Sequence, residues 1–515
     1  MLVTDLIAIL TGGIGASRPP MQDTMAARKK VENVILGGGE PGKYMAWELA
    51  REGRQTVVIE RALIGGSCPN VACLPSKNLI HSAKVADLVR RAGDYGQRNG
   101  HATTDFVQVR ARKRSMVDGL VEIQRKRFAA NGLEFILGEG RLVAPRMVEV
   151  HLAGGETRLL EFERLFLDLG THAMVPDIPG LADAVPLTHV KALELERLPE
   201  HLIVLGGGYV GVEFAQAFRR FGSRVTIVEQ GPRLLGCEDP EVAETVHTIF
   251  ADDGIDVILS VETRAVEGRS GTRVVMHIGT AAGEEVLEGS DVLVAAGRTA
   301  NTKGIGLDCA GVELDPRGYI KVNERLETTA PAVWAMGECA GSPLFTHAAF
   351  DDFRVVRDNL AGGTRTTRDR LVPNCTFIDP ELGRVGLNEI EAKQKRIDVR
   401  VIALPMASVL RARTLGETQG FMKAVLARGS DRILGFTMLG PQAGEVTSVV
   451  QTAMLGGLPY TALRDAIFAH PTMAEGLNVL FTNAPTSRQE PDRDLREKHL
   501  GDSRRPIEGP AGAAR

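Results

Sequence analysis

Two stretches of the chain, residues 32–60 and 201–229, repeat one pattern of apolar and polar positions. Each begins with a short apolar run (ENVIL, HLIVL), passes through a glycine-rich turn into a segment with helical spacing, and ends on a second apolar run (TVVIE, VTIVE). Short apolar runs bounded by turn residues are typical of buried strands, and apolar positions three or four apart predict a helix. Both stretches therefore predict a strand, a helix and a second strand.

The pattern near the C-terminus is different. Strand-like runs at 421–427 (FMKAVLA) and 433–439 (ILGFTML) precede helical segments at 445–455 (EVTSVVQTAML) and 460–468 (YTALRDAIF), which predicts an α+β domain. Both ends of the chain lack such periodicity. We expect a disordered leader over residues 1–30 and a flexible, charged, Pro/Gly-rich tail over residues 486–515.

Composition narrows the class of protein. A length of 515 residues predicts about three domains. The 57 glycines, with aromatic residues at only 5% and no repeat period, favour an α/β protein with many tight turns. The 61 basic and 65 acidic residues nearly balance, which argues against a nucleic-acid partner. No apolar run approaches a membrane span, and the short run LIAIL after Asp5 does not fit a secretory signal, so we expect no membrane partner and a cytoplasmic location.

Each repeated stretch also contains glycines at G-x-G-x-x-G spacing and an acid at the end of its second strand. These residues are Gly37, Gly39, Gly42 and Glu60 in the first stretch, and Gly206, Gly208, Gly211 and Glu229 in the second. The glycines allow a diphosphate to approach a helix N-terminus, and the acid accepts hydrogen bonds from ribose hydroxyls. One such motif is weak, but two complete copies indicate two dinucleotides and hydride transfer between them. Glu229 favours NAD(H) over NADP(H) because a carboxylate repels a 2′-phosphate, although Arg233 leaves a cation close by.

Cys68 and Cys73 lie five residues apart, ahead of a helix-like segment. On an ideal helix these positions are roughly 8.7 Å apart, whereas a disulfide requires Cα atoms within about 7 Å. Either the helix begins irregularly, which Pro69 and Pro75 favour, or the two thiols never bond. A helix N-terminus and the following Lys77 would both stabilise a thiolate. The alternative is a pair of small core residues, but beside two dinucleotide sites a redox role is favoured. No Cys or His cluster has metal-ligand spacing, so we predict no metal site.

The segment GGSCPNVACLPSK resembles the redox-active segment of the class I flavin-dependent pyridine nucleotide–disulfide oxidoreductases, which include dihydrolipoamide dehydrogenase, mercuric reductase and glutathione reductase. The blocks DVLVAAGRTANT, TTAPAVWAMGECAG, RLVPNCTFIDPELGRVGLNEIEAK and IFAHPTMAEGL are also similar to that family. The resemblance implies an α/β fold with two Rossmann-like domains, for FAD and NAD, and a C-terminal α+β dimerisation domain. The implied boundaries are 31–170 and 297–363 for the FAD domain, 171–296 for the NAD(H) domain and 370–485 for the interface domain.

The resemblance also implies a role for each matching residue. Cys73 would face the flavin and Cys68 would exchange with substrate, while Lys77 would lie near the flavin and pair with Glu213. In a homodimer, His470 would serve the partner subunit's site as the acid–base group, oriented by Glu475; its ordinary pKa suits thiol chemistry near neutral pH. The implied cofactor-binding residues are Gly37, Gly39, Gly42, Glu60, Lys77, Gly170, Glu338 and His347 for FAD, and Gly206, Gly208, Gly211, Glu229 and Arg298 in and beside the NAD(H) domain.

Some residues depart from the family's pattern. Glu40 stands in the FAD glycine loop, Asp168 replaces a usual Ala, and Glu338 replaces a usual Asp. Pro69 and Ala72 differ from the commonest loop of the lipoamide-type enzymes.

The branch of the family is predicted from cysteines and the second acid. Within this sequence no Cys precedes Cys68 and none follows Cys375, so the extra cysteine pairs of many mercuric reductases are missing. Glu229 argues against a glutathione reductase-like coenzyme site, and FTHAAFDD resembles the lipoamide branch. We therefore predict an FAD-dependent NAD(P)H–disulfide oxidoreductase most like dihydrolipoamide dehydrogenase, acting on a small thiol, disulfide or other electron acceptor. The alternatives are a mercuric reductase-like reductase of a metal or other acceptor, and a redox-sensing or scaffold flavoprotein without disulfide turnover.

Overall fold

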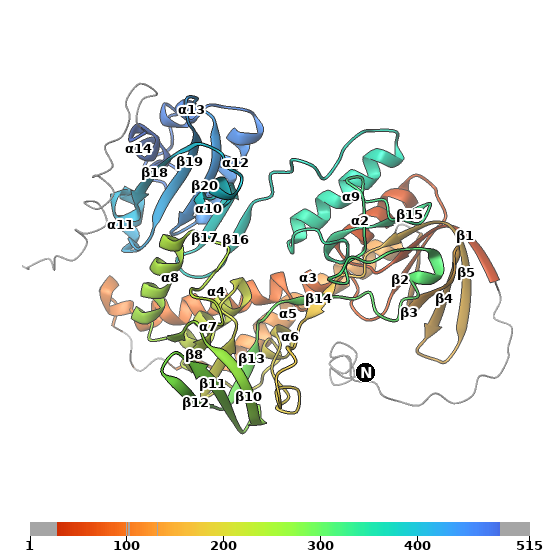
Figure 1. The fold of residues 1–515 in the computed structure, drawn as a ribbon, viewed down its shortest axis with the longest axis horizontal. Helices are drawn as coiled ribbons and strands as arrows, with labels where there is room; N and C mark the ends of the chain where they lie inside the picture. The colour runs from red at the N-terminus through yellow and green to blue at the C-terminus, as the bar shows by residue number, and fades with distance from the viewer. Residues whose placement is uncertain (1–27, 99, 101–102, 131, 485–515) are drawn as a thin grey trace, which may run out of the picture. The chain divides into compact units, whose positions relative to one another are not determined.

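The structure is a computed structural model that describes residues 28–98, 100, 103–130 and 132–484 (Figure 1). The chain forms two compact units, residues 1–383 and 384–515. Most of the predicted leader, residues 1–27, and the predicted tail, residues 486–515, lie outside the described residues.

The first strand includes the last three residues of the predicted leader. Arg28, Lys29 and Lys30 pair in parallel register with Leu159, Leu160 and Glu161 of a neighbouring strand. Two of these basic side chains also form ion pairs: Arg28 with Glu161 at 2.7 Å, and Lys29 with Glu134. A basic sequence that looks like a solvated leader is thus ordered by acids from strands far along the chain.

A six-stranded sheet carries the first glycine motif. Its strands are β1 (Arg28–Leu36), β2 (Thr56–Glu60), β3 (Glu134–Ala144), β4 (Met147–Leu152), β5 (Thr157–Leu167) and β15 (Val333–Ala335). The central β1 is parallel to β2 and β5, β3 extends the parallel sheet beyond β2, and β15 extends it beyond β5. β4 joins β3 to β5 with antiparallel pairing. β2 is buried along its whole length, as expected for a parallel strand covered on both faces.

The helices of this part of the chain include the two that carry the cysteines. They are α2 (Glu40–Arg51), α3 (Ser67–Asn70), α4 (Cys73–Arg90), η1 (Ala92–Tyr95), α5 (Phe106–Ala130) and α9 (Thr346–Leu360), with short turns η2 (Asp308–Ala310) and η3 (Gly337–Ala340). α2 and α9 pack side by side on one face (Figure 1). Their core joins Ile35 and Phe166 of the sheet to Met45 of α2 and Phe353 of α9.

A second, four-stranded parallel sheet carries the second glycine motif. The sheet order is β13-β7-β8-β9, from β7 (His201–Leu205), β8 (Arg224–Val228), β9 (Asp256–Ile258) and β13 (Asp291–Val294). The accompanying helices are α6 (His189–Ala192), α7 (Tyr209–Phe221) and α8 (Pro240–Asp252). An antiparallel meander of β10 (Glu262–Arg269), β11 (Arg273–Thr280) and β12 (Gly283–Gly289) packs beside it, and β6 (Thr171–Ala173) pairs with β14 (Arg298–Ala300) where the chain enters and leaves this region.

The second unit is built on antiparallel strands. After β16 (Asn374–Thr376), the strands β17 (Leu382–Gly386), β20 (Ile433–Leu439), β19 (Phe421–Ala427) and β18 (Val399–Pro405) follow one another in that order across the sheet. The helices are α10 (Glu389–Gln394), α11 (Leu410–Leu415), α12 (Ala443–Leu455), α13 (Tyr460–Arg464) and α14 (Gly476–Thr482), with the turn η4 (Met406–Ser408). β19 and β20 have the predicted bounds, whereas the helix predicted over 460–468 ends at Arg464.

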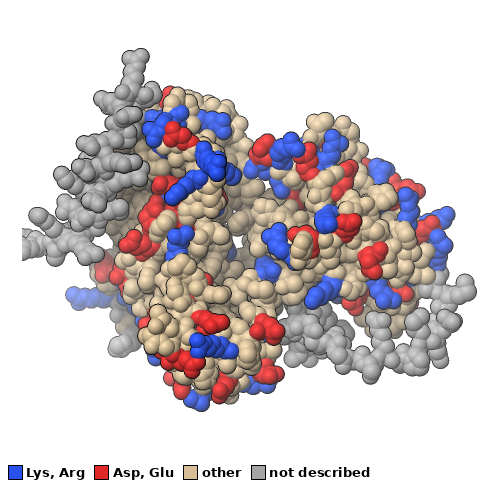
Figure 2. Space-filling model, viewed as in Figure 1, with Lys and Arg blue, Asp and Glu red and all other residues tan. Residues whose placement is uncertain are grey.

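These elements confirm the predicted fold class, with two Rossmann-like sheets and a C-terminal α+β unit. Within the described part of the chain, no helix has both the length and the apolar character to cross a bilayer. On the face drawn in Figure 2, basic and acidic side chains are interspersed.

Candidate functional site: two dinucleotide loops and a cysteine pair

The first glycine loop joins β1 to α2 and has no room for side chains. Gly37 has φ +101°, and a Cβ there would come within 2.0 Å of the Asp168 carbonyl oxygen. A Cβ on Gly42 would approach the Gly37 carbonyl oxygen to 2.5 Å. Glu60, at the end of β2, accepts N–H bonds from Gly38 at 2.8 Å and from Ala62 and Leu63. The bare loop, the helix N-terminus and the acid beside it fit the ADP half of FAD.

The second loop joins β7 to α7 in the same way. Gly206 has φ +110°, and a Cβ on Gly211 would lie 1.9 Å from the Gly206 carbonyl oxygen. Gly208 faces open space. Glu229, at the end of β8, accepts N–H bonds of 2.6 Å from Gly207 and from Gly231. The carboxylate is thus held at the edge where a ribose would lie, so this loop fits a second dinucleotide.

A break between two helices brings the cysteines together. Cys68 lies in the four-residue α3, and α4 begins at Cys73. Between them, Val71 (φ −140°, ψ 7°) and Ala72 (φ −132°, ψ −105°) leave the helical conformation. The two free thiols hydrogen-bond each other. The irregular helix start that the sequence left open is therefore the one adopted.

The surroundings of Cys73 favour its thiolate. The hydrogen bond from Cys68 lowers the pKa of Cys73 to about 6, assisted by Thr346 and Lys77 and opposed by burial. The Cys73 sulfur lies 3.1 Å from the Thr346 hydroxyl, at the start of α9. The hydrogen bond to Cys73 and burial raise the pKa of Cys68. In the reduced pair near neutral pH, these shifts favour the thiolate at Cys73 and the thiol at Cys68.

Lys77 forms an ion pair with Glu213 between α4 and α7. Its ammonium lies 2.8 and 3.1 Å from the two carboxylate oxygens, and Glu213 is only 6% exposed. The backbone N–H of Phe377 also bonds to Glu213 at 2.8 Å, and the Lys77 ammonium lies 4.8 Å from the Phe377 ring centroid. A lysine held by three contacts places a fixed positive charge one turn after Cys73.

The remaining predicted FAD residues lie in η3, just before β6 and in the first turn of α9. Glu338, in η3, contacts the Thr171 hydroxyl and forms a 3.3 Å ion pair with Arg298 of β14. Gly170, with φ +63°, immediately precedes β6. His347 donates from Nε2 to the Pro373 carbonyl at 2.8 Å and stacks on Phe345.

His470 and Glu475 form a pair within the second unit. Glu475 lies 2.9 Å from Nδ1 of His470, which leaves Nε2 directed away from the carboxylate. The His470 side chain is 62% exposed, so the imidazole is accessible to another molecule. The predicted pairing of the two side chains is therefore present in the geometry.

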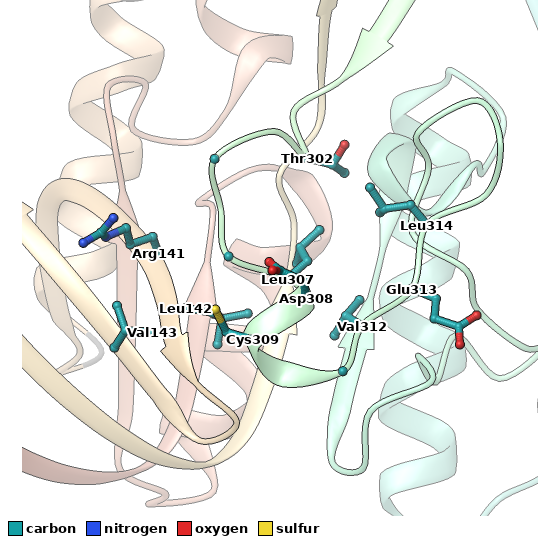
Figure 3. Close-up of a pocket in the computed structure, with 13 residues that line it drawn as sticks. Arg141, Leu142, Val143, Thr302, Leu307, Asp308, Cys309, Val312, Glu313 and Leu314 are labelled. Atoms are coloured by element: carbon teal, nitrogen blue, oxygen red, sulfur yellow. The ribbon is translucent and has the colours of Figure 1, made fainter.

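The cavity shown in Figure 3 is separate from these groups. It has a volume of about 1030 Å³ and lies between β3 residues such as Arg141 and the segment from Thr302 to Leu314. No residue predicted for the cofactor or cysteine sites lines it.

Thr346 and Phe377 were not predicted as site residues, and no role was predicted for Asp168. Thr346 immediately precedes His347 in a block already singled out, and a Thr at a helix start is a usable signal. Phe377 acts mainly through its backbone N–H, for which its residue type gives no signal.

Two dinucleotide loops flanking a polarised cysteine pair define a flavin- and nicotinamide-dependent disulfide oxidoreductase. Comparison with protein-family models agrees with this class. Residues 31–352 match the model described as pyridine nucleotide-disulphide oxidoreductase, and residues 372–480 match the dimerisation domain of the same family. The chain belongs to the class I pyridine nucleotide–disulfide oxidoreductase family. The fold and family predicted from the sequence are thus confirmed.

Relatives that match over nearly their whole length are named after different activities. The chain is 36% identical to a probable pyridine nucleotide-disulfide oxidoreductase, RclA, of Escherichia coli K12 over 88% of this chain and 99% of the relative. It is 33% identical to a mercuric reductase of Streptomyces lividans (86% and 94%) and 33% identical to a dihydrolipoyl dehydrogenase of Thermus scotoductus (87% and 96%). Among solved structures, the HOCl-induced flavoprotein disulfide reductase RclA of E. coli superposes with a TM-score of 0.80 at 36% identity, covering 88% of this chain and all of the other. These relatives support a flavoprotein oxidoreductase that uses FAD and leave its substrate open.

Proposed function

We propose that the chain is an FAD-dependent disulfide oxidoreductase that passes electron pairs between NADH and a small thiol or disulfide through Cys68 and Cys73. The observation that carries this proposal is the polarised pair, in which the pKa of Cys73 is lowered to about 6 by Cys68, Thr346 and Lys77. Bound at the first loop, FAD would relay the hydride electrons between nicotinamide and the cysteines. A structural pair of buried thiols needs neither this polarisation nor a lysine fixed beside it.

In the reductive direction the electron balance is simple. The Cys68–Cys73 disulfide takes two electrons from NADH and one proton, which gives the Cys68 thiol and the Cys73 thiolate. His470 of the partner subunit takes the proton of the Cys68 thiol, and the Cys68 thiolate attacks an acceptor disulfide to form a mixed disulfide. The departing thiolate then receives that proton from His470. The Cys73 thiolate then attacks Cys68, which restores the internal disulfide and releases the second thiolate. This thiolate takes up a proton from water. The net reaction converts NADH, a proton and one disulfide to NAD⁺ and two thiols.

Lys77, Glu213 and Glu475 position and balance these groups. Lys77 supplies a fixed positive charge that stabilises negative charge near Cys73, and Glu213 keeps the lysine in place. Glu475 holds Nδ1 of His470, so Nε2 is the nitrogen that exchanges protons with substrate.

The coenzyme and the oligomer are part of the proposal. The Glu229 carboxylate at the end of β8 supports NAD(H) over NADP(H). A homodimer is supported by the dimerisation-domain match and by apolar side chains exposed on the second unit. These exposed residues are Ile397, Leu410, Leu455, Leu458, Ile467 and Val479.

Anaerobic titration with NADH tests the core reaction. The purified protein should be yellow, and NADH should produce a long-wavelength charge-transfer band that the Cys73→Ser variant lacks. A wild-type protein that binds FAD and NADH but shows no such band would overturn disulfide reduction. That result, with no turnover on any acceptor, would favour the sensing or scaffold function instead.

The acceptor is tested by direct comparison. Dihydrolipoamide oxidation by NAD⁺ remains the predicted reaction, supported by the relative from T. scotoductus. A metal acceptor is the second candidate, because relatives are named mercuric reductase and a Cu(II) complex of the E. coli reductase superposes with a TM-score of 0.81. Rates with dihydrolipoamide, a small disulfide, Hg(II) and Cu(II), measured on wild type and Cys68→Ser, should single out one class. Turnover unaffected by Cys68→Ser would refute exchange at that thiol.

A further inference from the structure

The carboxyl group of Asp168 lies inside the FAD glycine loop. Asp168 directly follows β5, and its Oδ2 accepts the N–H of Gly42 at 2.9 Å. A Cβ placed on Gly39 or on Gly42 would come within 2.7 Å of that same oxygen. The carboxyl therefore occupies space that the glycines keep open at the first turn of α2.

This arrangement reduces the donors that the loop offers to an anion. A helix N-terminus usually presents free N–H groups to a diphosphate. Here Pro41 has no N–H, Gly42 donates to Asp168, and Lys43 donates to the Gly39 carbonyl at 3.0 Å. Among residues 39–43 of the described chain, only the N–H groups of Gly39 and Glu40 donate to no other group of the protein.

The charges facing Asp168 disfavour its ionised form. Burial, opposed by the Gly42 hydrogen bond, raises the pKa of Asp168 well above its usual value, and the carboxylates of Glu60 and Glu40 raise it further. Lys43 opposes this effect, but its ammonium lies 2.6 Å from Glu40 and largely balances that charge. The Cys339 thiol of η3 faces the same group, and burial raises its pKa to about 12, so it stays neutral.

We propose that Asp168 is a positioning residue of the FAD loop that must be neutral when the diphosphate binds, so that FAD binding is coupled to the uptake of one proton. The proposal rests on the proposed function, in which this loop holds FAD. A neutral carboxyl keeps one oxygen as acceptor for the Gly42 N–H and gains an O–H that can donate to the cofactor. An ionised carboxyl only accepts, and it repels the negative diphosphate.

The sign of the pH dependence follows from the balance Asp168–COO⁻ + H⁺ + FAD → Asp168–COOH·FAD. Below the pKa of Asp168 in the apoprotein, the group is already neutral and the Kd for FAD does not change with pH. Above that pKa, each binding event takes up a proton, so the Kd rises by up to about tenfold per pH unit.

Fluorescence titration of the apoprotein with FAD, between about pH 5.5 and about pH 9, tests the coupling. We expect the Kd of the wild type for FAD to rise with pH above a threshold. Asp168→Asn keeps an acceptor for the Gly42 N–H and always carries a donor. Its Kd for FAD should therefore be independent of pH and lower than that of the wild type at alkaline pH. Glu163→Gln removes an exposed carboxyl from β5, the strand that precedes Asp168, and should retain the wild-type slope. Equal slopes in wild type and Asp168→Asn would overturn the proposal.

Calorimetry of the wild type gives a result that does not depend on folding of a variant. Titration of FAD in two buffers with different ionisation enthalpies should reveal uptake of about one proton per FAD at the alkaline end. Saturable FAD binding without proton uptake would overturn the role of Asp168 and leave the proposed function intact. No FAD binding at any pH would overturn the proposed function itself.

Discussion

Thr346 contributes one hydrogen bond to the stabilisation of the Cys73 thiolate, after the larger contribution of Cys68. Its hydroxyl lies 3.1 Å from the Cys73 sulfur. An ionised sulfur can only accept, so with the thiolate the hydroxyl must be the donor, and the bond stabilises the thiolate over the thiol. Thr346→Val keeps the shape of the side chain and removes the donor. We therefore expect the pKa of Cys73 to rise in this variant.

The size of the rise follows from the strength of the bond. A hydrogen bond to a charged group contributes about 1.5–3 kcal/mol, and sulfur acceptors belong at the lower end. Since about 1.4 kcal/mol corresponds to one pH unit, the pKa of Cys73 should rise from about 6 to about 7. At neutral pH this change would lower the thiolate fraction from about nine-tenths to about one half.

Site-specific alkylation measures this pKa. The reduced apoprotein is treated with iodoacetamide at a series of pH values, and modification of Cys73 is followed by peptide mass spectrometry. Thr346→Ser retains a hydroxyl and should titrate like wild type. An unchanged midpoint in Thr346→Val, or an equal rise in Thr346→Ser, would refute the argument that the hydroxyl stabilises the thiolate.

Three further variants test other parts of the structure. Glu229→Gln should narrow the preference for NADH, measured as the ratio of kcat/KM for NADH and NADPH, and an unchanged ratio would contradict the role of this carboxylate. Burial raises the pKa of Asp379, but Arg220 and Lys84 lower it more, so ionised Asp379 contributes stability that is lost as pH falls through its lowered pKa. Asp379→Asn should therefore cost about 3 kcal/mol in urea unfolding at neutral pH and less in acid; an equal loss at both pH values would argue against the ion pairs. His470→Ala should slow steady-state disulfide turnover by about 100-fold or more while stopped-flow reduction by NADH keeps its rate, and equal losses in the two assays would exclude an acid–base role.

Local sequence signals located the elements that build the two loops. The glycine spacing and the acids identified both strand–helix–strand units. The glycines are a local signal because the tight turn after each first strand requires a positive φ, as at Gly37 and Gly206. The strands β19 and β20 were predicted with their observed bounds, since each is a continuous apolar run. The ordered strand over residues 28–30 was not predicted, because its partners lie more than a hundred residues away.

The parts of the site that escaped prediction depend on distant contacts. Thr346 and Cys73 are 273 residues apart in sequence, and Phe377 and Glu213 are 164 apart. No local periodicity encodes which helix start will face the cysteines. Whether Cys68 and Cys73 could meet was also undecidable from spacing, since it depends on the backbone at Val71 and Ala72.

The two glycine loops provide a comparison within one chain that isolates the side chain of Asp168. Asp168 follows β5 and Ala295 follows β13, and the two residues occupy equivalent positions. The Asp168 N–H donates to the Leu36 carbonyl at 2.8 Å, and the Ala295 N–H donates to the Leu205 carbonyl at 2.8 Å. Leu36 and Leu205 are the last residues of the strands that lead into the two loops. In each case a Cβ on the first glycine of the loop would meet the carbonyl oxygen of this residue, at 2.0 Å and 2.6 Å. The backbones therefore correspond, and a carboxyl replaces a methyl group. Proton uptake is accordingly expected when FAD binds and not when NADH binds, and Asp168→Ala should make the first loop behave like the second. If FAD and NADH took up equal numbers of protons on binding, the pH dependence would come from a feature that both loops share. Asp168 would then not be its cause.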